Sequence, residues 1–103
     1  MSVEKYQLGK ELDSFNHQQV QADILAILEK GCSVVIDMTA CNYISSIGLR
    51  VLLYSKKVAA SKGQKVYLVG ISEEVKDIMN VTGFSSFFDS FSTMEECLRA
   101  IEN

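Results

Sequence analysis

The side chains that most often carry out chemistry are scarce in this chain. It has one histidine, His17, and three cysteines, Cys32, Cys41 and Cys97. Acid–base catalysis and metal binding both draw heavily on histidine. The cysteine spacings match no zinc or redox motif, and an odd number does not suit a disulfide framework. We therefore expect no metal site and no cofactor, and we predict that the chain is not an enzyme.

Cys41 and His17 are the residues on which an enzymatic interpretation would rest. Cys41 could be the nucleophile of a phosphotransfer enzyme, but no glycine-rich or basic segment follows it that could hold a phosphate. His17 lies beside Asn16, Gln18 and Gln19 near the start of a predicted helix, where we expect a solvated or capping role. We predict that all three cysteines are structural thiols in a reducing cytoplasm, because free cysteine packs as a small hydrophobe.

Ser46 has both a structural and a chemical interpretation. At the start of a predicted helix, a serine hydroxyl usually accepts a hydrogen bond from a first-turn N–H group, which stabilises the helix by about 1 kcal/mol. The same place suits a phosphate, because the free N–H groups of a helix N-terminus favour anions. No Gly-x-Ser-x-Gly motif surrounds Ser46, so nucleophilic catalysis is not expected. The residues alone leave open whether Ser46 is a cap or a modification site.

The residues after Ser46 carry two further signals. Glycine in a first helical turn costs about 1 kcal/mol relative to alanine, so Gly48 indicates a close approach by a neighbouring strand or by a partner protein. The helical period places Ile47 and Arg50 on neighbouring surface, outside the apolar stripe. We predict that this stripe comprises Leu49, Leu52, Leu53 and Ala60.

Strand-like and helix-like segments alternate along the chain and must position these residues. We predict strands at Val3–Leu8, Ser33–Met38, Lys65–Val69 and Phe87–Phe88. We predict helices from a cap at Asp13 or Ser14 to Gly31, from Ser46 to Ser61, from a cap at Ser72 to Gly83, and from a cap at Thr93 to Ile101. This order predicts one small α/β domain over residues 1–103, with a parallel or mixed central sheet and helices packed on it.

The carboxyl ends of the strands are the expected place for a binding site in such a sheet. Residues 9–14 follow the first predicted strand, and residues 39–46 follow the central one. If these two strands are adjacent and parallel, both loops lie at one edge of the sheet. The start of the Ser46 helix then lies at the same edge.

Composition excludes several classes of protein. The chain has 103 residues and a net charge of −3, whereas nucleic-acid-binding proteins concentrate lysine and arginine. No stretch approaches the roughly 20 apolar residues of a membrane-spanning helix. The N-terminal residues lack the basic and then apolar pattern of a signal peptide. We expect a cytoplasmic protein without membrane insertion.

The order of motifs resembles the STAS domain family, the sulphate transporter and anti-sigma factor antagonist domains. The markers are residues 9–13 (GKELD), 34–39 (VVIDMT), 43–53 (YISSIGLRVLL), 66–70 (VYLVG) and 75–84. The resemblance runs from about Leu8 to Ile101. As a short chain, the protein is most similar to the bacterial anti-sigma factor antagonists.

The resemblance implies a switch that acts through exchange of partners. The chain would bind a serine-kinase anti-sigma factor, which frees the sigma factor. Phosphorylation at Ser46, with Ser45 as the second choice, would end this interaction, and a serine phosphatase would restore it. ATP and magnesium would belong to the kinase. The partner-binding surface implied by the family comprises Asp13, Ser45, Ser46, Ile47 and Arg50.

The chain departs from the family pattern in two places. The family often has aspartate before the modified serine, where this chain has Ser45. The extra N-terminal strand of many members is expected to be short or absent. An alternative function is a non-enzymatic STAS subunit of a transporter, for example in lipid transport, that docks an ATPase subunit without modification.

Overall fold

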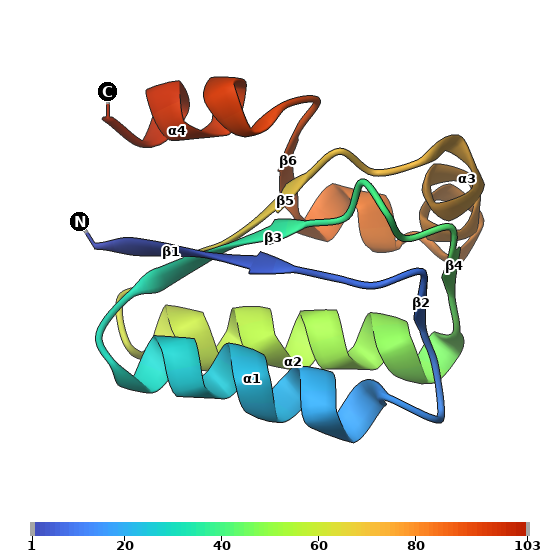
Figure 1. The fold of residues 1–103 in the computed structure, drawn as a ribbon, viewed down its shortest axis with the longest axis horizontal. Helices are drawn as coiled ribbons and strands as arrows, with labels where there is room; N and C mark the ends of the chain where they lie inside the picture. The colour runs from blue at the N-terminus through green and yellow to red at the C-terminus, as the bar shows by residue number, and fades with distance from the viewer. Residues whose placement is uncertain (1, 103) are drawn as a thin grey trace.

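A four-stranded parallel sheet forms the centre of the molecule, as Figure 1 shows. The computed structural model describes residues 2–102. The strands are β1 (Val3–Gln7), β3 (Ser33–Asp37), β5 (Val66–Val69) and β6 (Asp89–Phe91). They lie in the order β1-β3-β5-β6, and every neighbouring pair is parallel. The predicted α/β class is therefore confirmed.

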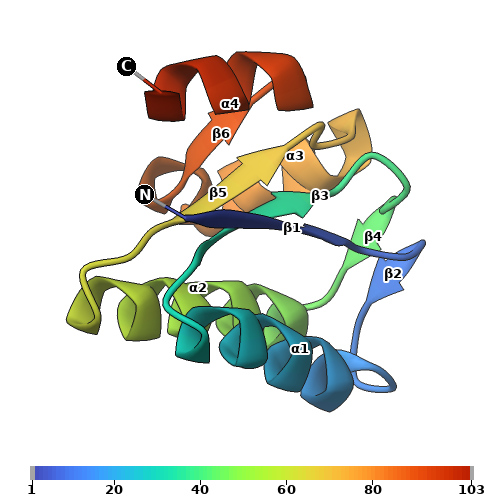
Figure 2. The same cartoon turned by 60° about the vertical axis from the view of Figure 1, so that its left-hand side comes forward.

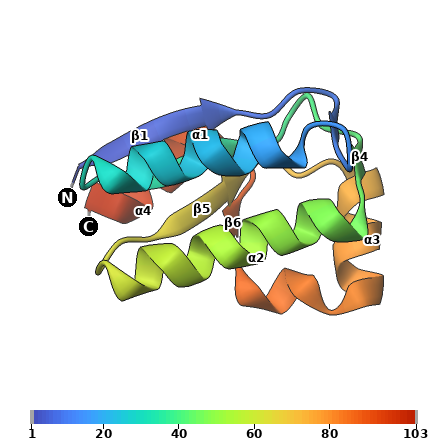
Figure 3. The same cartoon turned by 90° about the horizontal axis from the view of Figure 1, so that it is seen from below.

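Helices cover both faces of this sheet. They are α1 (His17–Glu29), α2 (Ser46–Ser61), α3 (Glu73–Thr82) and α4 (Met94–Glu102), and a 3₁₀ turn, η1 (Phe84–Phe87), follows α3. Helices α1 and α2 lie side by side on one face (Figure 3), while α4 lies on the opposite face (Figure 2). Helix α3 lies near β4 at the end of the sheet where α2 begins.

The two faces of β3 belong to two separate cores. Val34 and Ile36 pack in the larger core, together with residues of α1, α2 and α3. Val35 points to the other face and packs with Tyr67 and Cys97 in a smaller core beneath α4. All three β3 side chains are fully buried, which explains why this strand is apolar at consecutive positions.

A second, very short parallel pair extends the fold beyond the main sheet. It consists of β2 (Glu11–Leu12) and β4 (Tyr43–Ile44), and Leu12 is in register with Ile44. From the sequence alone both segments are expected to be loops, because two residues cannot show an alternating pattern. The pair joins the loop after β1 to the loop after β3.

Several predicted helix ends are confirmed. Ser72 caps α3 by accepting a hydrogen bond from the Val75 N–H at 3.3 Å, and Thr93 accepts one from the Glu96 N–H at 3.1 Å. Gly83 ends α3 in a left-handed conformation with φ 79°.

Three local predictions are wrong. The N-cap of α1 is Asn16, not Asp13 or Ser14, because the preceding residues form their own turn. The predicted strand at Phe87–Phe88 is displaced, since η1 takes up Phe87 and β6 begins at Asp89.

The third error concerns the buried stripe of α2. Ala60 is exposed, while Ser55 and Ala59 are buried. Ser55 tolerates burial because its hydroxyl donates to the Val51 carbonyl at 2.8 Å.

Candidate functional site

The loops after β1 and β3 meet at one edge of the sheet, as their parallel pairing requires. The Ser45 N–H donates to the Leu12 carbonyl at 3.0 Å, and the Asn42 N–H donates to the Lys10 carbonyl at 2.9 Å. Asp13 and Ser45 therefore leave the β2–β4 pair side by side, at the start of α2. The structure thus places Asp13 beside the segment that holds Ser46.

Ser45, rather than Ser46, is the N-cap of α2. Its hydroxyl oxygen accepts a hydrogen bond from the Gly48 N–H at 3.2 Å. Ser46 is the first helical residue and is exposed, and its hydroxyl has no hydrogen-bond partner among residues 2–102. The capping interpretation of Ser46 is therefore wrong, and the Ser46 hydroxyl is available to other molecules.

Gly48 is required by the neighbouring strand. A Cβ atom at this position would lie 2.6 Å from the Leu12 carbonyl oxygen and 2.9 Å from Cγ1 of Ile44. Of the two explanations that the sequence left open, close approach of a strand is the one confirmed. Gly48 allows α2 to begin directly against β2 and β4.

Ile47 and Arg50 lie beside Ser46 on the outer part of α2. Ile47 is half-buried and Arg50 is exposed. The first turn of α2 contains no acidic residue, and Arg50 forms no ion pair within the described part of the chain. The N-terminal N–H groups and the Arg50 guanidinium therefore make this end of α2 favourable for negative charge.

Two aromatic residues at this edge were not predicted to belong to a site. Phe15, in the turn after Asp13, has 95% of its surface exposed, and Tyr43 on β4 has 49%. Phe15 lies two residues after Asp13 in the sequence, and this proximity is the signal that points to it. Nothing in the sequence indicates, however, that its ring points into solvent.

The cysteines and the histidine offer no reactive arrangement. All three cysteines are free thiols, and Cys41 and Cys97 are buried. Burial raises the pKa of both buried thiols, and Cys41 Sγ donates to the Tyr43 carbonyl at 3.3 Å. Cys41 is therefore held as the neutral thiol, which is the poorer nucleophile. His17 Nδ1 lies 3.2 Å from the Ser14 carbonyl oxygen, within its own turn.

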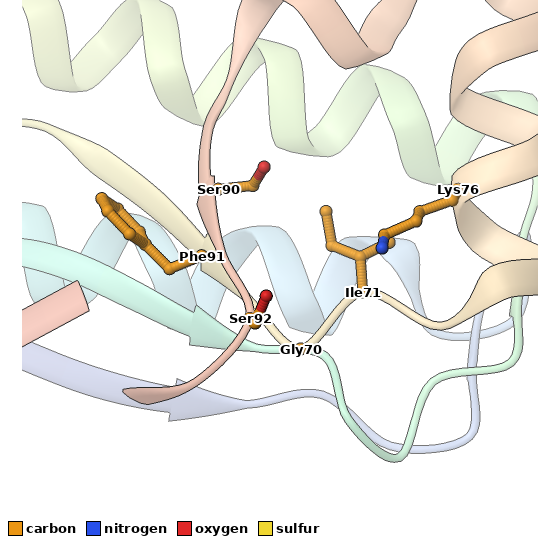
Figure 4. Close-up of a pocket in the computed structure, with 6 residues that line it drawn as sticks. All are labelled: Gly70, Ile71, Lys76, Ser90, Phe91 and Ser92. Atoms are coloured by element: carbon orange, nitrogen blue, oxygen red, sulfur yellow. The ribbon is translucent and has the colours of Figure 1, made fainter. Parts of the chain in front are cut away.

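The hollows of the described surface lie mostly away from Ser46. Figure 4 shows one of about 240 Å³ at the ends of β5 and β6, where the Lys76 side chain and the Ser90 and Ser92 hydroxyls line it. This volume is below the roughly 300–1,000 Å³ of small-molecule sites. Another, of about 450 Å³, lies at the start of β5. An open hollow of about 300 Å³ borders Asp13 and Phe15.

Metal-binding clusters and membrane-spanning helices are both absent from residues 2–102. Within these residues, no three His, Cys, Asp or Glu side chains cluster in a way that could hold a metal ion. None of the described helices is both long enough and apolar enough to span a membrane.

Comparisons with known proteins identify the family. The STAS domain model matches residues 3–97, so the chain belongs to the STAS domain family. A protein of Bordetella bronchiseptica that carries the name anti-sigma factor antagonist BtrV is 33% identical over 93 residues, which cover 88% of this chain and 79% of BtrV. The resemblance found from the sequence motifs is confirmed.

Solved structures agree on the fold. TM1081 of Thermotoga maritima, described as an anti-sigma factor antagonist, superposes with a TM-score of 0.89 at 21% identity, covering 98% of this chain and 88% of TM1081. The anti-sigma factor antagonist SpoIIAA, in its unphosphorylated form, gives 0.82 at 17% identity, covering 98% and 89%. SpoIIAA of Bacillus has also been solved in a phosphorylated form.

The same fold occurs inside a transporter. The murine anion transporter Slc26a9 matches with a TM-score of 0.81 at 17% identity, covering 99% of this chain but 18% of the transporter.

Proposed function

We propose that this chain is a non-enzymatic anti-sigma factor antagonist in the cytoplasm. With Ser46 unmodified, it binds a serine-kinase anti-sigma factor and frees the sigma factor. Phosphorylation of Ser46 by that kinase ends the interaction, and a serine phosphatase restores it. The kinship with BtrV supports this function, and the fold shared with SpoIIAA is compatible with it.

The surroundings of the Ser46 hydroxyl carry the proposal. A kinase needs a hydroxyl that is exposed and not committed to the fold, and Ser46 meets both requirements within the described residues. Ser45 is half-buried, and its hydroxyl is engaged with the Gly48 N–H at 3.2 Å. These differences favour Ser46 over Ser45 as the acceptor.

The fold itself tolerates a phosphate at this position. Phosphorylation adds nearly two negative charges at neutral pH, and anions near a helix N-terminus gain roughly 0.3–1 kcal/mol. The first turn of α2 contains no acidic side chain, and the carboxylate of the neighbouring Asp13 accepts the Phe15 N–H. Release of the kinase must therefore arise at the interface, through desolvation of the phosphate or repulsion by like charges.

Incubation with the cognate kinase and ATP, followed by mass spectrometry, tests the proposal. We expect one added phosphate on the wild-type chain, none on Ser46→Ala, and one on the matched Ser45→Ala control. An unmodified wild-type chain would refute the kinase substrate, and phosphate on Ser45 alone would refute the choice of Ser46.

A pull-down separates the switch from the transporter alternative. Wild type and Ser46→Asp are used as bait against lysate of the native cell. The switch predicts a kinase that wild type retains and Ser46→Asp loses. If both baits recover transporter ATPase subunits and no kinase, the result would favour the alternative, in which this chain docks an ATPase subunit without being modified. The occurrence of the same fold in the transporter Slc26a9 is compatible with that alternative.

A further inference from the structure

Hydrogen bonds before and after Phe15 fix the turn that holds its side chain away from the rest of the protein. The Phe15 N–H donates to Asp13 Oδ1 at 2.9 Å, and the Asp13 N–H donates to Asn16 Oδ1 at 2.9 Å. Asn16 Nδ2 donates to the Glu11 carbonyl at 2.7 Å, and the His17 N–H donates to the Asp13 carbonyl at 2.9 Å. The side chains of Asp13 and Asn16 thus maintain the backbone shape that presents the ring.

The exposure of this ring is unusual in extent and in place. Single exposed apolar residues are common on protein surfaces and need no explanation. Phe15, however, is 95% exposed, and it lies in the turn that leaves β2 next to the Ser46 segment. A rigid aromatic side chain loses little conformational freedom on binding, so such residues are effective anchors of interfaces.

The surface beside the ring has a shallow, open hollow. An open hollow of about 300 Å³ borders Phe15 and is lined by Gly9, Lys10, Glu11, Asp13 and Asn16. A projecting ring next to a hollow offers shape complementarity to a protein surface, because a partner can cover the ring and fill the hollow together. The two negative charges of Glu11 and Asp13 exceed the single positive charge of Lys10 around this hollow. This net negative charge suits a partner whose pocket has a neutral or positive rim.

We propose that Phe15 is the aromatic anchor of the partner interface, and that it inserts into an apolar pocket on the serine-kinase anti-sigma factor. This inference rests on the proposed function and names a contact within it. The anchor and the acceptor serine are coupled through the backbone, since the Ser45 N–H donates to the Leu12 carbonyl at 3.0 Å. A kinase that binds Phe15 therefore has Ser46 at a defined position relative to its own surface.

Calorimetric titration with the purified kinase tests the anchor. We expect Phe15→Ala to bind roughly 10-fold or more weakly than wild type, in the range of interface hot spots. Phe15→Tyr retains the ring and should bind within about threefold of wild type. The matched control is Val81→Ala, an apolar residue 87% exposed on α3, which should leave affinity unchanged. Thermal unfolding should be the same for all four chains.

The outcomes distinguish the two levels of the proposal. If the wild-type chain fails to bind the kinase, the proposed function is refuted and the anchor with it. If wild type and Phe15→Ala bind equally well, the anchor alone is refuted. A wild-type dimer in sedimentation that Phe15→Ala abolishes would also refute it, because the ring would then belong to an interface between two copies.

Discussion

Ser45 and Ser46 are adjacent and chemically identical, yet the backbone gives them different surroundings. Ser45 has extended dihedral angles, φ −86° and ψ 171°, which turn its hydroxyl toward the first turn of α2. Ser46 already lies in the helix, and its hydroxyl is exposed. At the residue scale, one serine therefore stabilises the fold and the other is free for chemistry.

Substitution of each serine should separate these roles. We expect Ser45→Ala to lower the free energy of unfolding by about 1 kcal/mol, because it removes a helix cap. Ser46→Ala should change it by less than about 0.5 kcal/mol, as for most surface substitutions. Urea unfolding curves measure both values, and a larger loss in Ser46→Ala than in Ser45→Ala would contradict the assignment of the cap.

The cap of α2 is Ser45 and not Ser46, and the sequence alone could not distinguish the two. Either serine can cap a helix, and the boundary of a helix is uncertain by a residue or two when only the sequence is known. Asp13 illustrates the same limit. Its carboxylate has the chemistry of a cap, but it bonds to the Phe15 N–H two residues later and not to a helix.

At the scale of elements, the contact between α2 and the β2–β4 pair holds the site together. Gly48 is the point of closest approach, with the Leu12 carbonyl 2.6 Å from the place of a Cβ. In a solvent-exposed helix, replacement of glycine by alanine raises the free energy of unfolding by about 1 kcal/mol. Here we expect Gly48→Ala to lose roughly 1–3 kcal/mol, because overpacking pushes the elements apart.

The matched control for Gly48→Ala is Gly9→Ala. Gly9 lies in the loop after β1 and has no heavy atom within 4 Å of the place of its Cβ. Urea unfolding of both variants measures the difference. A Gly48→Ala chain as stable as wild type would show that α2 and β2 can separate without cost.

A phosphate on Ser46 should interact with Arg50 one turn along α2. Helical side chains lean toward the N-terminus, so an arginine at i+4 covers the surface around residue i. With phosphoserine incorporated at position 46, ³¹P NMR titration gives the second pKa of the phosphate. We expect Arg50→Gln to raise this pKa by roughly 0.15–0.4, because the guanidinium favours the dianion.

Lys57→Gln is the control for this titration. Lys57 is an exposed cation on the same helix, eleven residues beyond Ser46. At about 1.5 Å of rise per residue, it lies beyond the Debye length of roughly 8 Å at physiological salt. Equal pKa values for wild type and Arg50→Gln would exclude the Ser46–Arg50 interaction.

Short elements were the least predictable. The β2–β4 pair has two residues per strand, so its existence depends on backbone bonds between distant segments, such as the one from Asn42 to Lys10 at 2.9 Å. By contrast, α2 was predicted from Ser46 to Ser61 and is observed over the same range, because sixteen residues are enough to show a helical period.

At the scale of the whole molecule, the α/β class was predictable from the alternation of strands and helices along the chain, whereas the order of the strands was not. Apolar runs such as Val34–Ile36 predicted strands buried on both faces, and parallel pairing put their carboxyl ends at one edge. The exposure of Phe15 could not be predicted, because it depends on hydrogen bonds within a turn that has no periodic pattern.

The cysteines offer a test of the whole fold. Cys41 and Cys97 are buried with raised thiol pKa values, while Cys32 is partly exposed. A thiol reagent should therefore label Cys32 in the native protein, and the other two only as denaturant unfolds the chain. Peptide mass spectrometry after timed labelling measures the order. Labelling of Cys41 as fast as Cys32 in the native state would contradict its burial.

The two faces of the central sheet are protected very unequally. In the described part of the chain, α4 alone lies over Val35, Tyr67 and Val69, whereas α1 and α2 share the opposite face. If α4 detaches, an apolar strand surface opens between β1 and β6, whose outer edges are unpaired. Unpaired edges beside exposed apolar side chains promote pairing between chains. Substitutions that weaken the docking of α4 are therefore expected to cause aggregation before they affect the Ser46 edge.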